Sequence, residues 1–81
     1  MRSVARYALF VDGGEEDVEA IRLVERVLGG EVLIVDVGGS GLRGWMLWEY
    51  GTDRTPLLAA PHGVYYGLGA IRRLLASLKS R

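Results

Sequence analysis

EYGTDRTPLLAAPHGVYYG, residues 49–67, is the stretch of sequence that decides the fold. Within it, two short apolar runs at residues 57–60 and 64–66 are separated by the turn Pro61-His62-Gly63. Two such runs joined by a three-residue turn predict a β-hairpin. The hairpin is expected to bring a pair of antiparallel strands to the edge of a sheet, and Gly67 ends it.

Helices are predicted on both sides of this hairpin. After it, apolar residues recur at helical spacing from Leu68 to Leu78. Before it, residues 42–50 form a short segment that is apolar on nearly every side, because Trp45, Met46, Leu47 and Trp48 stand in a row. Such a segment fits either core packing or a dimer or partner surface, where Trp and Met are enriched.

The first half of the chain has the pattern of a βαβ unit. Residues 7–11 and 32–37 are apolar runs typical of strands, and residues 15–28 carry the apolar stripe of an amphipathic helix. The run at 32–37 shows no polar alternation, which predicts a strand covered on both faces of a parallel sheet. The crossover between the two strands is expected to be right-handed.

Taken together, the element order β-α-β-α-β-β-α predicts an α/β fold with a central four-stranded mixed sheet flanked by helices. A chain of 81 residues has room for one hydrophobic core, so residues 1–81 are expected to form a single domain. Another small α/β sandwich with a different strand order fits the same pattern, because hydrophobic periodicity does not fix strand order.

Composition excludes several kinds of chemistry. The chain has no cysteine, which rules out disulfides, thiol nucleophiles and dithiol exchange, and His62 is its one histidine. Ten acidic and ten basic residues cancel, so no nucleic-acid binding is expected, although the last helix is basic. No apolar run approaches the roughly 20 residues that span a bilayer, and no secretory leader is recognised. We therefore expect a cytoplasmic protein that does not bind a membrane.

An acidic group, which comprises Asp12, Glu15, Glu16, Asp17 and Glu19, follows the first predicted strand. Carboxylates in this number suit a Mg²⁺ or Ca²⁺ site, or a paired acid and base. Acidic residues in the first turn of a helix also complement the helix dipole, which explains the same residues without chemistry. We favour the second interpretation and expect no cofactor, no metal and no catalytic residue.

Several local motifs, in this order, resemble the thioredoxin superfamily, and glutaredoxins in particular because the chain is short. Glu49-Tyr50-Gly51 followed by Arg54-Thr55-Pro56-Leu57-Leu58 is similar to the family's YG and VP-T-L segment. Val35-Asp36-Val37 resembles the end of the family's second strand, and residues 63–67 resemble its final hairpin. The resemblance covers nearly the whole chain and implies a thioredoxin-like fold.

The resemblance also implies which residues surround the family's active site. Pro56 corresponds to the cis-proline before the third strand, and the backbone of Thr55 would pair with an extended thiol or peptide substrate. The C-x-x-C motif falls on Glu15-Glu16-Asp17-Val18, so the turn at Gly13-Gly14 is kept while both sulfur positions are lost. The polar residues that hold glutathione are replaced by Gly67-Leu68-Gly69, which argues against glutathione binding, although the backbone at Thr55-Pro56 still offers hydrogen bonds.

These features predict a redox-inactive, glutaredoxin-like domain that binds a protein partner or a second copy of itself and has no dithiol oxidoreductase activity. The alternative is a cysteine-free small-ligand or metal-binding protein that uses the acidic loop after the first strand. The candidate contact residues lie at the former active site and in the apolar segment: Gly14, Glu15, Thr55, Pro56, Trp45 and Trp48.

Overall fold

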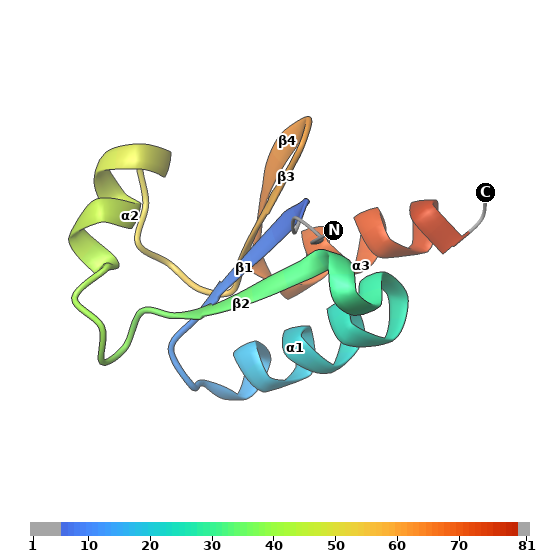
Figure 1. Ribbon diagram of the computed structural model, residues 1–81, viewed down its shortest axis with the longest axis horizontal. Coiled ribbons are helices and arrows are strands. Elements are labelled where there is room, and N and C mark those ends of the chain that lie inside the picture. The colour runs from blue at the N-terminus through green and yellow to red at the C-terminus, as the bar shows by residue number, and fades with distance from the viewer. Residues whose placement is uncertain (1–5, 80–81) are drawn as a thin grey trace, which may run out of the picture.

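A computed structural model describes residues 6–79 of the chain and shows a mixed α/β fold with a four-stranded sheet and three α-helices (Figure 1). The elements follow the predicted order, with one short 3₁₀ turn added after the first helix. They are β1 (Tyr7–Val11), α1 (Glu15–Leu28), η1 (Gly29–Glu31), β2 (Val32–Asp36), α2 (Arg43–Tyr50), β3 (Leu57–Ala60), β4 (Gly63–Tyr66) and α3 (Gly67–Lys79).

The strands lie in the order β2-β1-β3-β4. Strands β1 and β2 are parallel, as a βαβ unit requires, whereas β3 is antiparallel to both β1 and β4. The prediction of a hairpin at the edge of the sheet is therefore half right. Only β4 is an edge strand, because β3 lies beside β1 in the interior, and the other edge is β2.

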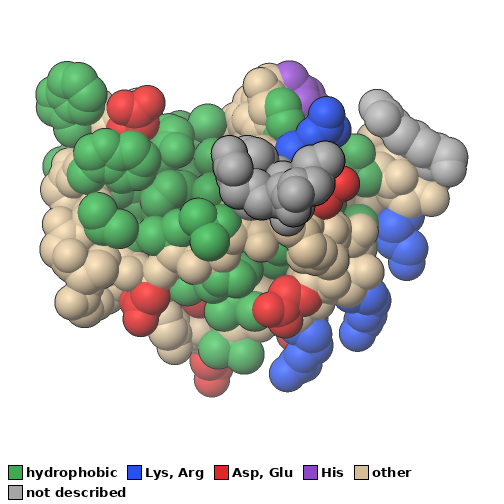
Figure 2. Space-filling view, viewed as in Figure 1, with side chains coloured by type: hydrophobic (Ala, Val, Ile, Leu, Met, Phe, Trp, Pro, Cys, Tyr) green, Lys and Arg blue, Asp and Glu red, His purple; other side chains and the backbone are tan. Residues whose placement is uncertain are grey.

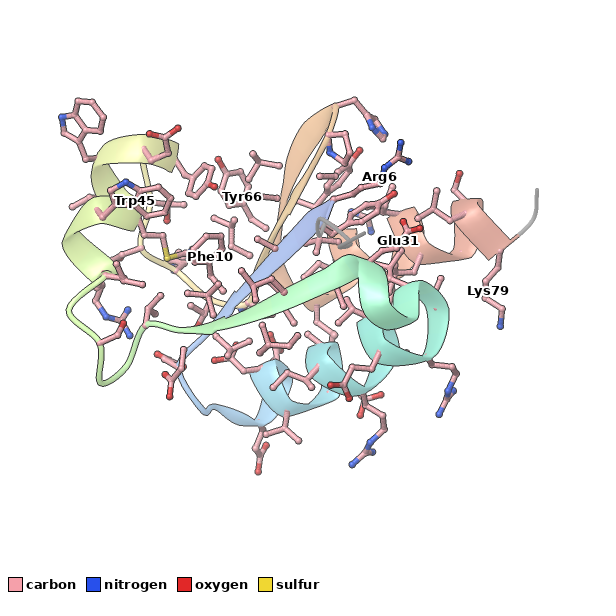
Figure 3. The ribbon with its side chains drawn as sticks, viewed as in Figure 1. Arg6, Phe10, Glu31, Trp45, Tyr66 and Lys79 are labelled. Carbon is pink, nitrogen blue, oxygen red and sulfur yellow. The ribbon has the colours of Figure 1, made fainter. Side chains whose placement is uncertain are left out.

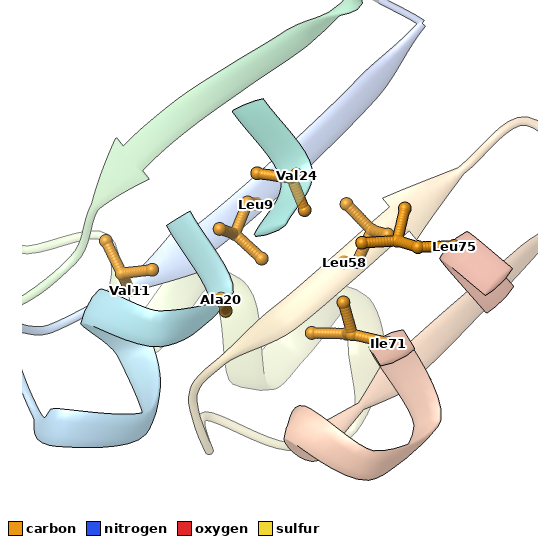
Figure 4. Packing of buried hydrophobic residues seen from close by; sticks show 7 residues of the cluster. All are labelled: Leu9, Val11, Ala20, Val24, Leu58, Ile71 and Leu75. Carbon is orange, nitrogen blue, oxygen red and sulfur yellow. The ribbon is translucent and has the colours of Figure 1, made fainter. Parts of the chain in front are cut away.

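Helices α1 and α3 pack side by side on one face of the sheet and enclose the larger core (Figures 1 and 4). Side chains at helical spacing on each helix meet alternate side chains of the strands, as the two periodicities require. Each fully buried Val or Leu of this kind contributes about 1.5–3 kcal/mol to the stability of the fold. The fully or nearly fully buried members are Leu9, Val11, Ala20, Val24, Leu58, Ile71 and Leu75.

Helix α2 lies on the opposite face and closes a second, smaller core. Its one buried side chain is Met46, which packs with Phe10 of β1, Leu57 of β3 and Val37 after β2. The helix ends at Gly51, which has a left-handed backbone and donates its N–H to the Leu47 carbonyl at 2.8 Å. At eight residues, about 12 Å, α2 is too short to cover this face of the sheet.

The shortness of α2 and the edge position of β2 together explain why β2 is not covered on both faces. The sequence predicted a strand covered on both faces, but β2 is an edge strand and Leu33 is 57% exposed. The apolar run ends one residue early as a strand, at Asp36. In the part of the chain that the structure describes, no helix is both long and apolar enough to cross a bilayer.

Candidate functional site

Two surfaces of the molecule bear on function, and the first is a pocket where the carboxyl end of β1, the start of α1 and the loop before β3 meet. The pocket is open to the surface and has a volume of about 750 Å³. It brings together three of the predicted contact residues, namely Gly14, Glu15 and Thr55. The remaining lining residues are Asp12, Glu16, Asp17, Arg43, Asp53, Arg54, Tyr66 and Gly67.

Asp17 is the hydrogen-bonding centre of this pocket. It is the third residue of α1, and its side chain reaches back because the N-cap residue, Gly14, has no side chain with which to cap the helix. One carboxylate oxygen, Oδ2, accepts hydrogen bonds from the Asp12 N–H at 2.7 Å, the Gly14 N–H at 3.3 Å and the Thr55 hydroxyl at 2.9 Å. Asp17 is only 2% exposed, so it joins β1, α1 and the loop before β3 from inside.

Arg43, the first residue of α2, makes the second link across the pocket. Its guanidinium forms an ion pair with the Asp12 carboxylate at 2.9 Å and donates a hydrogen bond to the Asp53 carbonyl at 3.0 Å. The short α2 is thereby tied to the loop after β1 and to the loop before β3. Both partners of the ion pair are partly exposed, so solvent screens their attraction and the pair contributes little to stability.

The two neighbouring carboxyl groups, Asp12 and Asp17, have pKa values that move in opposite directions. Burial raises the pKa of Asp17, and the contact with Asp12 adds to this effect. Hydrogen bonding with Asp17, and then with Arg43 and Thr55, holds the pKa of Asp12 well below its usual range. The pair therefore separates into one carboxyl that keeps its proton to higher pH and one that stays ionised.

Pro56 does not present the surface that the sequence predicted for it, although Thr55 lines the pocket. The Thr55–Pro56 peptide bond is cis, as the resemblance implied. However, the Pro56 side chain is fully buried, and its carbonyl accepts a hydrogen bond from the Gly67 N–H at 2.9 Å. The Thr55 hydroxyl donates to Asp17. Pro56 is therefore a supporting residue beneath the pocket, and its prediction as a contact residue is corrected.

The acidic group of the sequence does not form a metal centre. Within residues 6–79, no group of three or more His, Asp or Glu side chains is arranged to hold a metal ion. Asp17 is occupied by three hydrogen bonds and Asp12 by Arg43, while Glu19 turns away to Arg22 at 3.5 Å and Arg72 at 3.7 Å. These residues support the architecture of the loop and helix.

The second surface is the face of the sheet on the α2 side, which we call the α2 face. Residues paired in register point to the same side, so two rows of side chains cross this face. The row next to α2 runs Val35, Phe10, Leu57, Tyr66 and is the row against which Met46 packs. The other row, which we call the open row, consists of Leu33, Ala8, Ala59 and Val64.

The open row has small side chains in its middle and larger, more exposed ones at its ends. Its two inner residues, Ala8 and Ala59, are small and only partly buried, while the outer residues, Leu33 and Val64, are 57% and 37% exposed. Figure 2 shows apolar side chains gathered over α2 and the adjoining part of the molecule, with most charged side chains outside this region. The α2 face is therefore an apolar surface that residues 6–79 leave partly exposed.

The two predicted tryptophans belong to this face and not to the pocket. Trp45 is 46% exposed, and its ring lies 5.9 Å from Phe10 and 5.7 Å from Tyr50 (Figure 3). Trp48 is 83% exposed. Neither residue lines the pocket, so the structure divides the predicted contact residues between two surfaces. The sequence allowed either core packing or a partner surface for residues 42–50, and the structure contains both, because Met46 packs in the core while Trp48 faces solvent.

Sequence reasoning missed Arg43 and the whole open row. Arg43 gave no signal, because an isolated arginine before an apolar segment has no recognisable spacing to its two acceptors. The open row depends on strand order and register, which place Leu33 and Ala8 side by side across two strands. No known protein-family model matches this sequence, and a comparison with curated proteins finds no relative.

Proposed function

We propose that this chain is a redox-inactive, thioredoxin-like domain that acts as a protein-interaction module through its α2 face. The order β-α-β-α-β-β-α and the four-stranded mixed sheet with helices on both faces support the assignment to this class. Redox inactivity follows from chemistry, because thiol-disulfide exchange needs a thiolate and the chain contains no cysteine.

The network around Asp17 supports the same view of the former active-site position. In the predicted alignment, Glu15-Glu16-Asp17-Val18 stands where the family has its C-x-x-C motif. Asp17 is buried there and bonded to Thr55, the residue that would otherwise face a substrate. A position between the two cysteines of active relatives thus holds the loop together in this chain.

The observation that carries the proposal is the clustering of exposed large apolar side chains. Seven of the eight in the described residues lie on β2, β4, α2 or the residue before α2, and Val18 on α1 is the exception. Scattered exposed hydrophobics are ordinary, but a contiguous patch of them marks an interaction site. Exposed tryptophans strengthen this inference, since Trp is the residue type most enriched at binding hot spots.

The pocket favours a second candidate function, the binding of a small cationic molecule. Five carboxyl-bearing residues and two arginines line it, so its balance is acidic. This function ranks second because Asp12 and Asp17 are already engaged by Arg43 and Thr55. A saturable rise in melting temperature with agmatine, absent with the uncharged amide of the same length, would establish it.

Site-specific photocrosslinking in the source cell tests the interaction module. A photoreactive phenylalanine analogue replaces Trp48 in one variant and Val18 in the matched control, because both side chains are exposed but lie on opposite sides of the sheet. We expect a discrete crosslinked adduct from position 48 and none from position 18. Equal yields from both positions would contradict the assignment of the α2 face as an interface.

A further inference from the structure

The half-covered α2 face has a geometry that suits a second copy of the same chain. Helix α2 covers one half of the face, around Phe10 and Leu57, and the open row occupies the other half. A two-fold axis that lies in the plane of the interface, between the two halves and parallel to the rows, turns the two faces toward each other and sets each half against the partner's other half. Each α2 then lies over the partner's open row, and the face of both sheets becomes covered.

We propose that this chain forms a two-fold symmetric homodimer in which the two α2 helices lie side by side as one shared layer between the two sheets. The proposal rests on the proposed function, since it names the partner of the same α2 face. Each α2 contacts its own sheet through Met46 and presents Leu47 and Trp48, 50% and 83% exposed, to the partner. The partner's Ala8 and Ala59 are small, partly buried side chains beside its own Met46 cluster, and the exposed Leu33 and Val64 flank them.

The exposed area is sufficient for such a dimer. The exposed parts of Trp45, Trp48, Tyr66, Leu33, Leu47 and Val64 add up to roughly 500 Å², from ~200 Å² for an aromatic and ~100 Å² for an aliphatic side chain. A standard interface buries about 800 Å² per partner, of which about 65% is apolar in homodimers. The apolar part of a standard interface is therefore already present on one face.

The charges at the two ends of the face are complementary under the same symmetry. Glu49 is exposed on α2 at one end. Arg6 is exposed at the other end and points to the α2 side, because its neighbour Tyr7 packs into the α1 and α3 core (Figure 3). The two-fold axis brings Glu49 of each copy toward Arg6 of the other.

The test is the solution mass of the purified chain, by light scattering and sedimentation from about 1 µM to 500 µM, a range that brackets typical weak homodimers. Leu33→Asp and Trp48→Asp place a charge in the interface at side chains that are exposed in the monomer, so both variants should fold. Val18→Asp, at a 48% exposed apolar residue on α1, is the matched control. We expect a dimer in which each interface variant raises the dissociation constant at least about tenfold, with no change in the control.

The orientation has its own test. Arg6→Glu and Glu49→Arg should each weaken the dimer, because each places like charges opposite one another. The double variant should restore the dimer, because both charges of each symmetry-related pair are then reversed and attract again. A double variant that is as weak as the singles would overturn the two-fold arrangement. A wild-type chain that stays monomeric at 500 µM, or a dimer indifferent to both Leu33→Asp and Trp48→Asp, would overturn the homodimer.

This failure can be told apart from failure of the proposed function. If the chain is monomeric while photocrosslinking from position 48 yields an adduct with a different protein, the homodimer is wrong and the interaction module stands. If position 48 crosslinks no better than position 18, both proposals fail. An adduct of twice the chain's mass, confirmed by peptide mapping to the α2 face, supports both.

Discussion

Replacement of Asp17 by alanine should be among the most destabilising single changes outside the apolar core. The carboxylate oxygen accepts three hydrogen bonds, two from backbone N–H groups of residues 12 and 14 and one from the Thr55 hydroxyl. With alanine, all three donors lose their acceptor in a region where Asp17 is 2% exposed. An unpaired buried donor costs about 1–3 kcal/mol.

The expected loss for Asp17→Ala is about 3 kcal/mol, because the Gly14 donor is near the surface and recovers water while the other two do not. Asp17→Asn should lose only about 1 kcal/mol, since an amide oxygen in the place of Oδ2 accepts the same three hydrogen bonds, although more weakly than a carboxylate oxygen does. Removal of the buried charge also offsets part of that loss. A third variant, Thr55→Val, should cost about 1 kcal/mol and be partly redundant with Asp17→Ala.

Urea unfolding followed by far-ultraviolet circular dichroism measures these differences, with Thr52→Val as the control at a threonine whose hydroxyl accepts an exposed hydrogen bond. The double variant Asp17→Ala, Thr55→Val should be less destabilised than the sum of its singles by about 1 kcal/mol. Equal losses for Asp17→Ala and Asp17→Asn, or strict additivity with Thr55→Val, would refute the assignment of Asp17 as the acceptor that joins the three elements.

Three further predictions concern pH, the tryptophans and α2. Because the folded chain raises the pKa of Asp17, that residue's contribution to stability is full below about pH 3.9 and is lost as pH rises through its folded pKa. As the pH falls from 7 to 4.5, the unfolding free energy of wild type should therefore rise relative to that of Asp17→Asn. This pH range stays above the lowered pKa of Asp12. A difference between the two proteins that does not change with pH would contradict the prediction. Trp48→Ala should change monomer stability by less than about 0.5 kcal/mol, whereas Trp45→Ala should cost about 1–2 kcal/mol through its two ring contacts, as urea unfolding at low concentration will measure. Met46→Ala should cost about 2–5 kcal/mol and release α2 from the sheet, seen as added proteolytic cleavage near residues 43–50; protection like that of wild type would show another anchor.

The sequence predicts the elements of this fold well because its local signals are strong and agree. The stripe of apolar residues in α1 and the acidic first turn place that helix at residues 15–28, as the structure has it. The turn at Pro61-His62-Gly63 fixes the hairpin, and β3 and β4 begin and end within a residue of their predicted bounds. Each of these signals depends on a few neighbouring residues, so each can be recognised in a single sequence.

Burial of the same elements could not be predicted, since it depends on neighbours that are distant in the chain. A nearly all-apolar run at 32–37 looks like an interior strand, but strand order places β2 at the edge and leaves Leu33 exposed. Pro56 is the opposite case. The sequence predicts a surface contact residue, but residues from other elements bury it. Asp17 was grouped with the acidic first turn, and only the approach of Thr55 from 38 positions away separates it from Glu15 and Glu16.

The pocket and the α2 face are linked through one residue, Arg43. Arg43 begins α2 and is bound to Asp12 and to the Asp53 carbonyl, while Asp17 holds the Asp12 N–H in place. An eight-residue helix with a single buried side chain is not held by packing alone. The loop after β1 therefore helps to hold α2 in place. The position of that helix in turn decides which half of the sheet face stays exposed.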